Sequence, residues 1–103
     1  MIATKASESI DQAVLYELQN IIKSHGVVYA SEHEGYAVLL EEVEEAADNL
    51  KYINLCMNEL WNEVKSDAVS KDFLNSIKLG AIELAKEAVQ CAAVCERFQE
   101  TIK

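Results

Sequence analysis

The stretch Ser31 to Val43, written S-E-H-E-G-Y-A-V-L-L-E-E-V, decides the fold because it joins a helix start to a long apolar stripe. Ser31 and Glu34 form a capping-box pattern, and the carboxylates of Glu32 and Glu34 suit the positive end of a new helix. Two more glutamates follow Val43 directly. The stretch therefore predicts a helix that begins near Ser31 and carries acids beside its apolar side.

Apolar residues continue this stripe at alternating steps of three and four, which is the spacing of a coiled-coil seam. The nine positions are Tyr36, Leu39, Val43, Ala46, Leu50, Ile53, Met57, Leu60 and Val64. Because no proline or glycine interrupts them, we expect one long helix to about Lys65, with Asp48-Asn49 as the place for a bend. We expect the break at Ser66-Asp67, where Asp67 or Ser70 can cap the next helix.

Two further helices flank this one. The later seam comprises Leu74, Ile77, Ala81, Leu84, Ala88, Cys91, Cys95, Phe98 and Ile102. Gly80 lies inside it and indicates a close backbone approach. The first helix is expected to start near Ser7 or Ser9 and to stop at His25-Gly26, a C-terminal pattern.

Composition places the chain among all-α proteins and excludes several functions. The 103 residues, with 3 glycines and no proline, predict a single helical domain over 1–103. A net charge of −9 argues against binding to nucleic-acid polymers. Without a signal-peptide layout or a membrane span, and with three cysteines that we expect to be reduced, the chain is predicted to be cytoplasmic.

Helix length predicts self-association. Helices of about 30 residues are about 45 Å long, and one short first helix cannot cover them. We therefore expect a homodimer or homotetramer in which long antiparallel helices complete a four-helix-bundle-like core.

The acids of the long helix are not equivalent. At 100° per residue, Glu42 and Glu45 lie on one flank of the apolar stripe, whereas Glu41, Glu44 and Asp48 lie on the far side.

The last helix carries a matching group. Glu83, Glu87 and Gln90 share one flank of its seam, and Lys86 is turned outward. A hairpin that turns near Asp67 would set Glu45 level with Gln90 and close in height to Glu87, so that two helices offer oxygen ligands to one point.

Such a cluster suits a hard divalent cation, because magnesium held by carboxylates and phosphate oxygens recurs in nucleotide chemistry. The alternative is that these acids are only the solvated border of a coiled coil.

Two longer runs resemble a known family. The run H-E-G-Y-A-V-L-L-E-E-V-E-E, from His33 to Glu45, is similar to the first motif of the MazG-like, all-α nucleoside triphosphate pyrophosphohydrolases, in particular their small phage and prophage-type members. The run K-E-A-V-Q-C-A-A-V-C-E-R-F, from Lys86 to Phe98, resembles the second helix motif of those members. The E-E-x-x-E pattern alone is weak, but the longer first phrase is fairly specific.

The resemblance implies a MazG-type fold and magnesium-dependent hydrolysis, with manganese as a substitute, of a nucleotide between its α and β phosphates. It places metal ligands on Glu42, Glu45 and Glu87. Gln90 stands where the family has aspartate, which puts catalysis in doubt more than fold. Glu83 is a candidate to substitute for the missing acid, and Glu41 to orient the attacking water.

The functional predictions for other residues are weaker. Trp61 can stack on a base but is more often core or interface, and a histidine at a helix start, such as His33, is more often solvated. Lys51, Lys86 and Arg97 are the candidates for phosphate contacts.

Two functions of different class remain open: a magnesium-dependent nucleotide pyrophosphohydrolase, and a catalytically inactive helical-bundle module of the same fold that binds a protein or a nucleotide. A dimetal oxidase is disfavoured, because it requires Glu-x-x-His pairs that neither histidine supplies.

Overall fold

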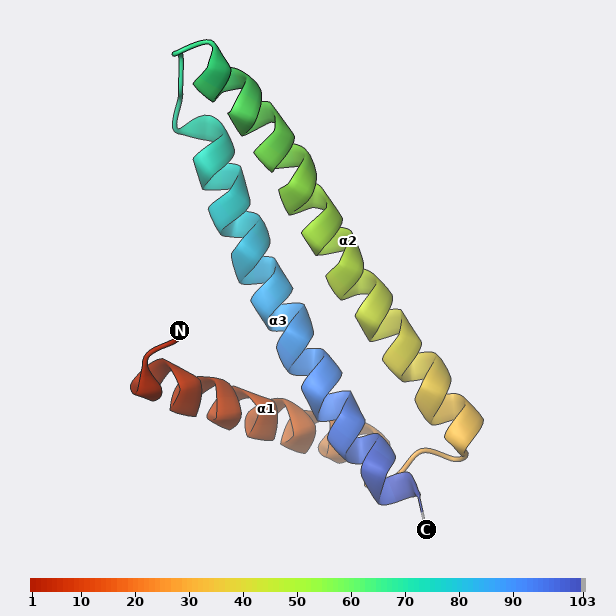
Figure 1. Ribbon diagram of the computed structural model, residues 1–103. Coiled ribbons are helices and arrows are strands. Elements are labelled where there is room, and N and C mark those ends of the chain that lie inside the picture. Colours follow the sequence, from red (N-terminus) through yellow and green to blue (C-terminus); the bar gives the residue numbers. More distant parts are fainter. Residues whose placement is uncertain (103) are drawn as a thin grey trace.

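The computed structural model describes residues 1–102 and consists of three α-helices, which confirms the predicted all-α class. They are α1 (Thr4–His25), α2 (Glu32–Lys65) and α3 (Asp72–Thr101). Figure 1 shows α2 and α3 as a long antiparallel hairpin, with α1 crossing α3 near its C-terminal half. No helix among residues 1–102 is both long enough and apolar enough to traverse a bilayer.

The ends of α2 follow the sequence signals. The Ser31 side-chain oxygen accepts a hydrogen bond of 3.1 Å from the Glu34 backbone N–H, as the capping pattern predicted. The helix runs without interruption to Lys65, and Asp67 then turns the chain with a left-handed φ of 51°. The long helix and its break are therefore confirmed.

The sequence misplaced the start of the first helix but identified a residue that caps the third. The first helix begins at Thr4 rather than at Ser7 or Ser9, and the Ser9 hydroxyl instead donates to the Lys5 carbonyl within the helix. The third helix begins after Lys71, and the Ser70 hydroxyl, one of the two predicted caps, accepts a hydrogen bond of 3.4 Å from the Asp72 backbone N–H. Glu63 in turn accepts hydrogen bonds from the Ser70 backbone and hydroxyl. A serine inside a helix can satisfy its own hydroxyl, which makes it a weak boundary marker.

The face of α2 that packs on α3 is displaced by one residue from the predicted seam. Four of the nine seam positions are half-buried as expected: Leu39, Ala46, Ile53 and Leu60. The other residues that face α3 are Gly35, Glu42, Asn49, Cys56 and Glu63. Because three of these five are polar, apolar periodicity alone assigned the wrong phase.

The other positions of the two seams are exposed, and all of them except Ile102, which follows α3, form what we call the apolar face. On α2 it comprises Tyr36, Val43, Leu50, Met57 and Val64, and on α3 Leu74, Ala81, Ala88 and Cys95. Their partners in the α3 seam are half-buried: Ile77, Leu84, Cys91 and Phe98. One hairpin thus covers only one of the two apolar rows on each helix.

Two glycines bring the hairpin helices close together. A Cβ on Gly35 would meet the Phe98 ring at 3.0 Å, and a Cβ on Gly80 would meet Ile53 Cγ1 at the same distance. The close approach predicted at Gly80 is confirmed. These contacts fix the register that sets the acids of α2 against those of α3.

Arg97 of α3 forms hydrogen bonds to the end of α1 and to the loop that follows it. Its side chain is buried and donates to the backbone carbonyls of His25, Gly26 and Val28 at 2.8 to 3.1 Å. The guanidinium also lies 4.0 Å from the centre of the Tyr29 ring. The C-terminal carbonyls of α1 are thus satisfied by a cation, which sets where α1 leaves the hairpin.

Candidate functional site: a carboxylate cluster between two helices

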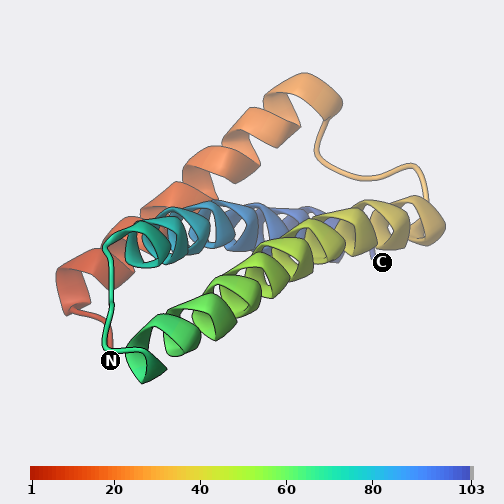
Figure 2. The same ribbon diagram turned by 90° about the horizontal axis from the view of Figure 1, so that it is seen from above.

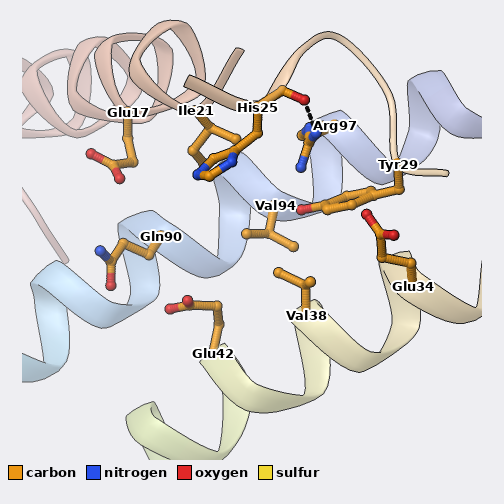
Figure 3. A pocket seen from close by; sticks show the side chains of 10 residues that line it. All are labelled: Glu17, Ile21, His25, Tyr29, Glu34, Val38, Glu42, Gln90, Val94 and Arg97. Carbon is orange, nitrogen blue, oxygen red and sulfur yellow. Dashed lines mark hydrogen bonds between the residues drawn. The ribbon is translucent and has the colours of Figure 1, made fainter. Parts of the chain in front are cut away.

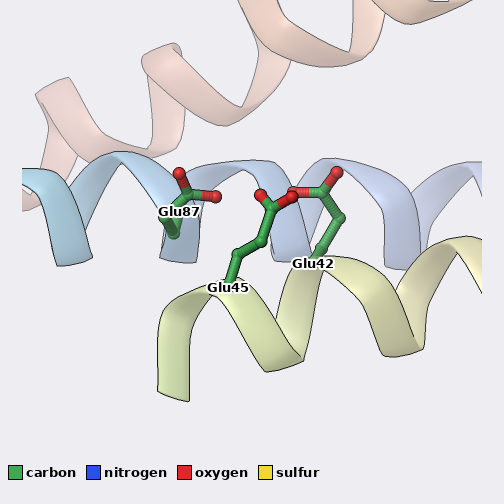
Figure 4. A group of neighbouring side chains, drawn as sticks. All are labelled: Glu42, Glu45 and Glu87. Carbon is green, nitrogen blue, oxygen red and sulfur yellow. The ribbon is translucent and has the colours of Figure 1, made fainter. Parts of the chain in front are cut away.

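Three carboxylates from two helices converge where the hairpin register predicted. Glu42 and Glu45 project from α2 and Glu87 projects from α3, and one oxygen of each lies within 4.8 Å of the others (Figure 4). Glu42 and Glu87 are half-buried, whereas Glu45 is exposed. The predicted meeting of these residues is confirmed, and metal binding remains a prediction.

Gln90 lies on α3, one turn after Glu87, and bridges two of the acids. With its amide nitrogen turned toward them, it donates to Glu42 Oε2 at 3.2 Å and to Glu87 Oε2 at 2.9 Å. Rotating the amide by half a turn exchanges nitrogen for oxygen. The same side chain can therefore donate to two carboxylates or present a carbonyl oxygen to a cation.

The cluster is electrostatically strained. Burial raises the pKa of Glu42, and the charges of Glu45 and Glu87 raise it further. Burial also raises the pKa of Glu87, and a hydrogen bond that its protonated carboxyl group donates to Glu45 raises this pKa further, as does the charge of Glu45. These acids therefore hold protons to higher pH than an isolated glutamate, and a cation between them would remove the repulsion.

The other sequence candidates lie outside the convergent group. Glu83 forms an ion pair of 2.9 Å with Lys86 on the exposed side of α3, and it acts on the cluster only by raising the pKa of Glu87. Glu41 is exposed and likewise raises the pKa of Glu42 through its charge. Glu44 and Asp48 are also exposed, in agreement with their predicted position on the far side.

A cavity of about 390 Å³ opens beside the cluster, between α1 and the hairpin (Figure 3). Glu42, one of the three acids of the cluster, and Gln90, which bridges two of them, also line this cavity. Three aliphatic side chains, Ile21, Val38 and Val94, give the cavity an apolar part. Its other lining residues are Glu17, His25, Tyr29, Glu34 and Arg97.

Sequence reasoning missed the part of this cavity that α1 contributes. Glu17 and Ile21 are one turn apart, which indicates a common helix face, but no pattern in the sequence says that this face turns toward α3. The hydrogen bonds of Arg97 to the end of α1 contribute to that orientation.

The three residues predicted to contact phosphate lie in different surroundings. Arg97 lines the cavity, although three of its hydrogen bonds go to backbone carbonyls. Lys86 lies at a neighbouring hollow with Glu87 and Gln90, and Lys51 is exposed on α2. Trp61 and His33 are both exposed, and neither lines the cavity beside the cluster.

One of the three cysteines, Cys91, lies near the acids of the cluster. All three thiols are free. Burial raises the pKa of Cys91, and the nearby charge of Glu42 raises it further. A thiol whose pKa is raised stays protonated and is a poor nucleophile.

The chain matches no model of a known protein family, and neither the curated proteins nor the solved structures yielded a match.

Proposed function

We propose that this protein is a magnesium-dependent nucleotide pyrophosphohydrolase of the MazG-like type, which converts an NTP or dNTP into a monophosphate and pyrophosphate. The observation that carries the proposal is the convergence of Glu42, Glu45 and Glu87 from two helices. The sequence resemblance selects the same three residues as ligands, independently of the geometry.

The donor set fits the proposed cation. Magnesium prefers oxygen ligands at about 2.1 Å, so two ligands of one ion lie no more than about 4.2 Å apart. The carboxylate oxygens lie within 4.8 Å, and glutamate side chains can close the difference by small rotations. In this proposal Glu42, Glu45 and Glu87 hold the ion, and Gln90 supplies a carbonyl oxygen.

The cavity supports a nucleotide rather than a bare phosphate as the substrate. Its volume of about 390 Å³ falls within the range of about 300–1,000 Å³ that is usual for small-molecule sites. The aliphatic residues from all three helices can receive a base or sugar, and Glu42 and Gln90 then face the phosphates at the border with the cluster.

In the proposed hydrolysis, the ion and the side chains have different roles. A bound magnesium ion would neutralise phosphate charge and polarise the phosphoryl oxygens. Hydrolysis breaks the P–O bond between the α and β phosphates. Water supplies the hydroxyl to one product, and its proton passes to a carboxylate.

Pyrophosphate release from a panel of canonical and modified NTPs and dNTPs, with magnesium, tests this proposal. We expect release by the wild type and a loss of at least tenfold in Glu42→Gln, Glu45→Gln and Glu87→Gln. Glu44→Gln is the matched control, because it removes a charge from the same helix outside the cluster. The proposal fails if no substrate is hydrolysed, or if the cluster variants behave like the control.

One observation favours the second function, an inactive module of the same fold. The Gln90 amide bridges Glu42 and Glu87 and thereby stabilises the acids without an ion. A thermal-shift titration separates the two functions: a bound cation raises the melting temperature by linkage, whereas an acid group satisfied by Gln90 gives no specific response to magnesium or manganese.

We also propose that the chain self-associates to complete a four-helix bundle. Its accessible surface is 7541 Å², whereas a compact chain of 11.5 kDa exposes about 5,800 Å². Its radius of gyration is 17.4 Å against about 13 Å for a compact domain of this length. No large side chain among residues 1–102 is fully buried.

A further inference from the structure

We infer that Arg97 and Tyr29 contact the edge of the substrate base that is remote from the sugar, and that the cavity selects bases with a carbonyl oxygen on that edge. Uracil, thymine, guanine and hypoxanthine are bases of this class. The choice of base rests on the nucleotide binding in the proposed function and deepens it by naming the class of substrate.

Arg97 is a buried cation without an anionic partner. Its side chain is 6% exposed, and no other charged side chain among residues 1–102 is buried. The one ion pair within those residues joins Lys86 to Glu83, so the guanidinium has no carboxylate at ion-pair distance there. A buried charge destabilises a protein unless its hydrogen-bonding groups are satisfied. The donors that Arg97 leaves unused are therefore significant.

Two of the five N–H donors of Arg97 remain unused. Nε donates to the Gly26 carbonyl, and the two N–H groups of Nη2 donate to the carbonyls of His25 and Val28. Both N–H groups of Nη1 are left without an acceptor among residues 1–102. Because Arg97 lines the cavity, these two donors are available to a molecule that binds there (Figure 3).

Tyr29 adds a second hydrogen-bonding group at the same end of the cavity. Tyr29 is 4% exposed, and its ring lies 4.0 Å from the Arg97 guanidinium carbon. Its backbone N–H donates to Thr101, but its hydroxyl forms no hydrogen bond within residues 1–102. Figure 3 shows this hydroxyl directed into the cavity, toward Val94. Two buried residues thus offer polar groups to the cavity that the described chain does not satisfy.

These groups lie at the opposite end of the cavity from the acid cluster. Gln90, Val94 and Arg97 follow one another on one face of α3, and at 1.5 Å per residue Arg97 lies about 10 Å beyond Gln90. Val38 and Val94 lie between the two ends (Figure 3), and α1 closes the cavity from one side of the hairpin (Figure 2). With the phosphates at the acid cluster and the nucleoside against the valines, the remote edge of the base faces Arg97.

The hydrogen-bonding chemistry of Arg97 selects a carbonyl oxygen. A guanidinium only donates, a carbonyl oxygen accepts, and the exocyclic amino group of adenine or cytosine only donates. An amino group at this edge would therefore set donors against donors in a buried place, where unpaired polar groups are costly. The Tyr29 hydroxyl can donate or accept, so it strengthens the binding of either kind of base without selecting between them.

The remaining polar residues of the cavity do not reverse this preference. Glu34 and His25 are exposed, so water can replace a hydrogen bond that a base fails to make with them. Glu17 acts at the other end of the cavity, where its charge raises the pKa of Glu42. The selection between bases therefore depends on Arg97.

Calorimetry with matched nucleotide analogues tests the selection without requiring turnover. The α,β-imido triphosphates of inosine and adenosine carry nitrogen in place of the oxygen between the α and β phosphates, and their bases differ in an oxo against an amino group at position 6. With magnesium present, we expect the inosine compound to bind at least about tenfold more tightly, and the uridine compound to bind more tightly than the cytidine compound. Equal binding, or tighter binding of the amino bases, overturns the inference.

Arg97→Met removes the donors while it retains a side chain of similar length. We expect the preference for inosine to fall to less than about twofold, through a loss of affinity for the inosine compound. Ile21→Ala is the matched control, because it alters the same cavity from α1 without removing a donor, and it should weaken both compounds equally. If Arg97→Met also weakens both equally, Arg97 contacts a phosphate or only positions α1, and the inference is wrong.

Tyr29→Phe keeps the test decisive if Arg97→Met does not fold, because it removes one oxygen and retains the ring. We expect both compounds to bind at least about threefold more weakly, with the preference for inosine retained. Unchanged affinities would show that the base does not reach this end of the cavity, and would overturn the inference.

Failure of the base selection and failure of the proposed function give different results. A preference for inosine without pyrophosphate release retains the selection and refutes the catalysis. Pyrophosphate release without a preference refutes the selection and retains the catalysis. If none of the analogues binds, the selection and the nucleotide binding on which it rests are both refuted.

Discussion

Gly35 of α2 lies directly against the ring of Phe98 on α3: a Cβ at residue 35 would meet three ring carbons at 3.0 to 3.1 Å. Both residues are covered by the hairpin, and they lie at the end that carries the cavity. The absence of one side-chain atom therefore allows the two helices to approach where the functional groups are positioned.

Gly35→Ala is expected to destabilise the protein despite the higher helix propensity of alanine. Overpacking costs about 1–3 kcal/mol, against a gain of about 1 kcal/mol from propensity, so we expect a net loss of about 1 kcal/mol in urea unfolding. In a Phe98→Leu background the clash is relieved, and the same substitution should become stabilising. If Gly35→Ala costs the same in both backgrounds, the ring is not the cause.

Arg97→Lys is expected to loosen α1 from the hairpin. A lysine retains the charge but cannot donate to three carbonyls in the fixed geometry of a guanidinium. Hydrogen bonds to charged groups contribute about 1.5–3 kcal/mol each, without simple additivity, and we expect a total loss of at least about 2 kcal/mol. Hydrogen exchange should accelerate in residues 22–30 before it does in the α2–α3 hairpin.

Lys86→Gln is the matched control for Arg97, because it removes a cation from the same helix but breaks only an exposed ion pair with Glu83. We expect a change of less than about 0.5 kcal/mol from it. Equal effects of the two substitutions would mean that net charge, rather than the carbonyl contacts, explains the role of Arg97.

Sequence patterns predicted the helix ends that local chemistry marks, such as the start of α2 and the end of α1. Ser31 and Gly26 act on the backbone within one helical turn, so the helix ends that they set can be predicted without the tertiary structure. The meeting of Glu45 with Glu87 was also predictable, since a hairpin with a known turn fixes which residues are level.

The phase of α2 and the position of α1 were not predictable in the same way. Glu42 and Asn49 face α3 and are half-buried, whereas the apolar Val43 and Leu50 are exposed. The place of α1 depends on Arg97, whose partners are backbone carbonyls about 70 residues away in sequence. Every residue has a backbone carbonyl group, so a pattern of side chains does not show which carbonyl groups Arg97 will contact.

In the absence of divalent cations, the Glu42 carboxylate is expected to lower stability as the pH rises. The folded state raises the pKa of Glu42 above its usual value of 4.5, through burial and neighbouring charges, so the folded protein binds more protons than the unfolded one above that pH. Stability therefore falls from pH 4.5 upward until the folded pKa is passed. Chemical unfolding in EDTA between pH 4.5 and 8 measures this.

The contribution of Glu42 is isolated by comparison with Glu42→Gln. We expect the two proteins to be about equally stable near pH 4.5, and the variant to become progressively more stable as the pH rises. A difference that is constant with pH, or one that favours the wild type at high pH, would contradict the strained cluster. Saturating magnesium should abolish the advantage of the variant, provided that the ion binds there.

Gln90→Glu is expected to act in opposite directions with and without metal. It replaces the amide that bridges Glu42 and Glu87 with a fourth carboxyl group of the same length. Without divalent ions the added repulsion should lower the melting temperature at pH 7 and enlarge its rise toward lower pH. With magnesium or manganese the extra charged oxygen should tighten binding at least tenfold, read from the shift of melting temperature with metal concentration.

Gln19→Glu provides the control for this variant, because it adds the same charge at an exposed position of α1. If Gln90→Glu lowers stability without strengthening the metal response, the cluster accommodates protons rather than a cation, and the inactive module becomes the better account. If Gln90→Glu strengthens both the metal response and pyrophosphate release, Gln90 limits the activity of a working site. The charge at residue 90 therefore decides between the two functions within one fold.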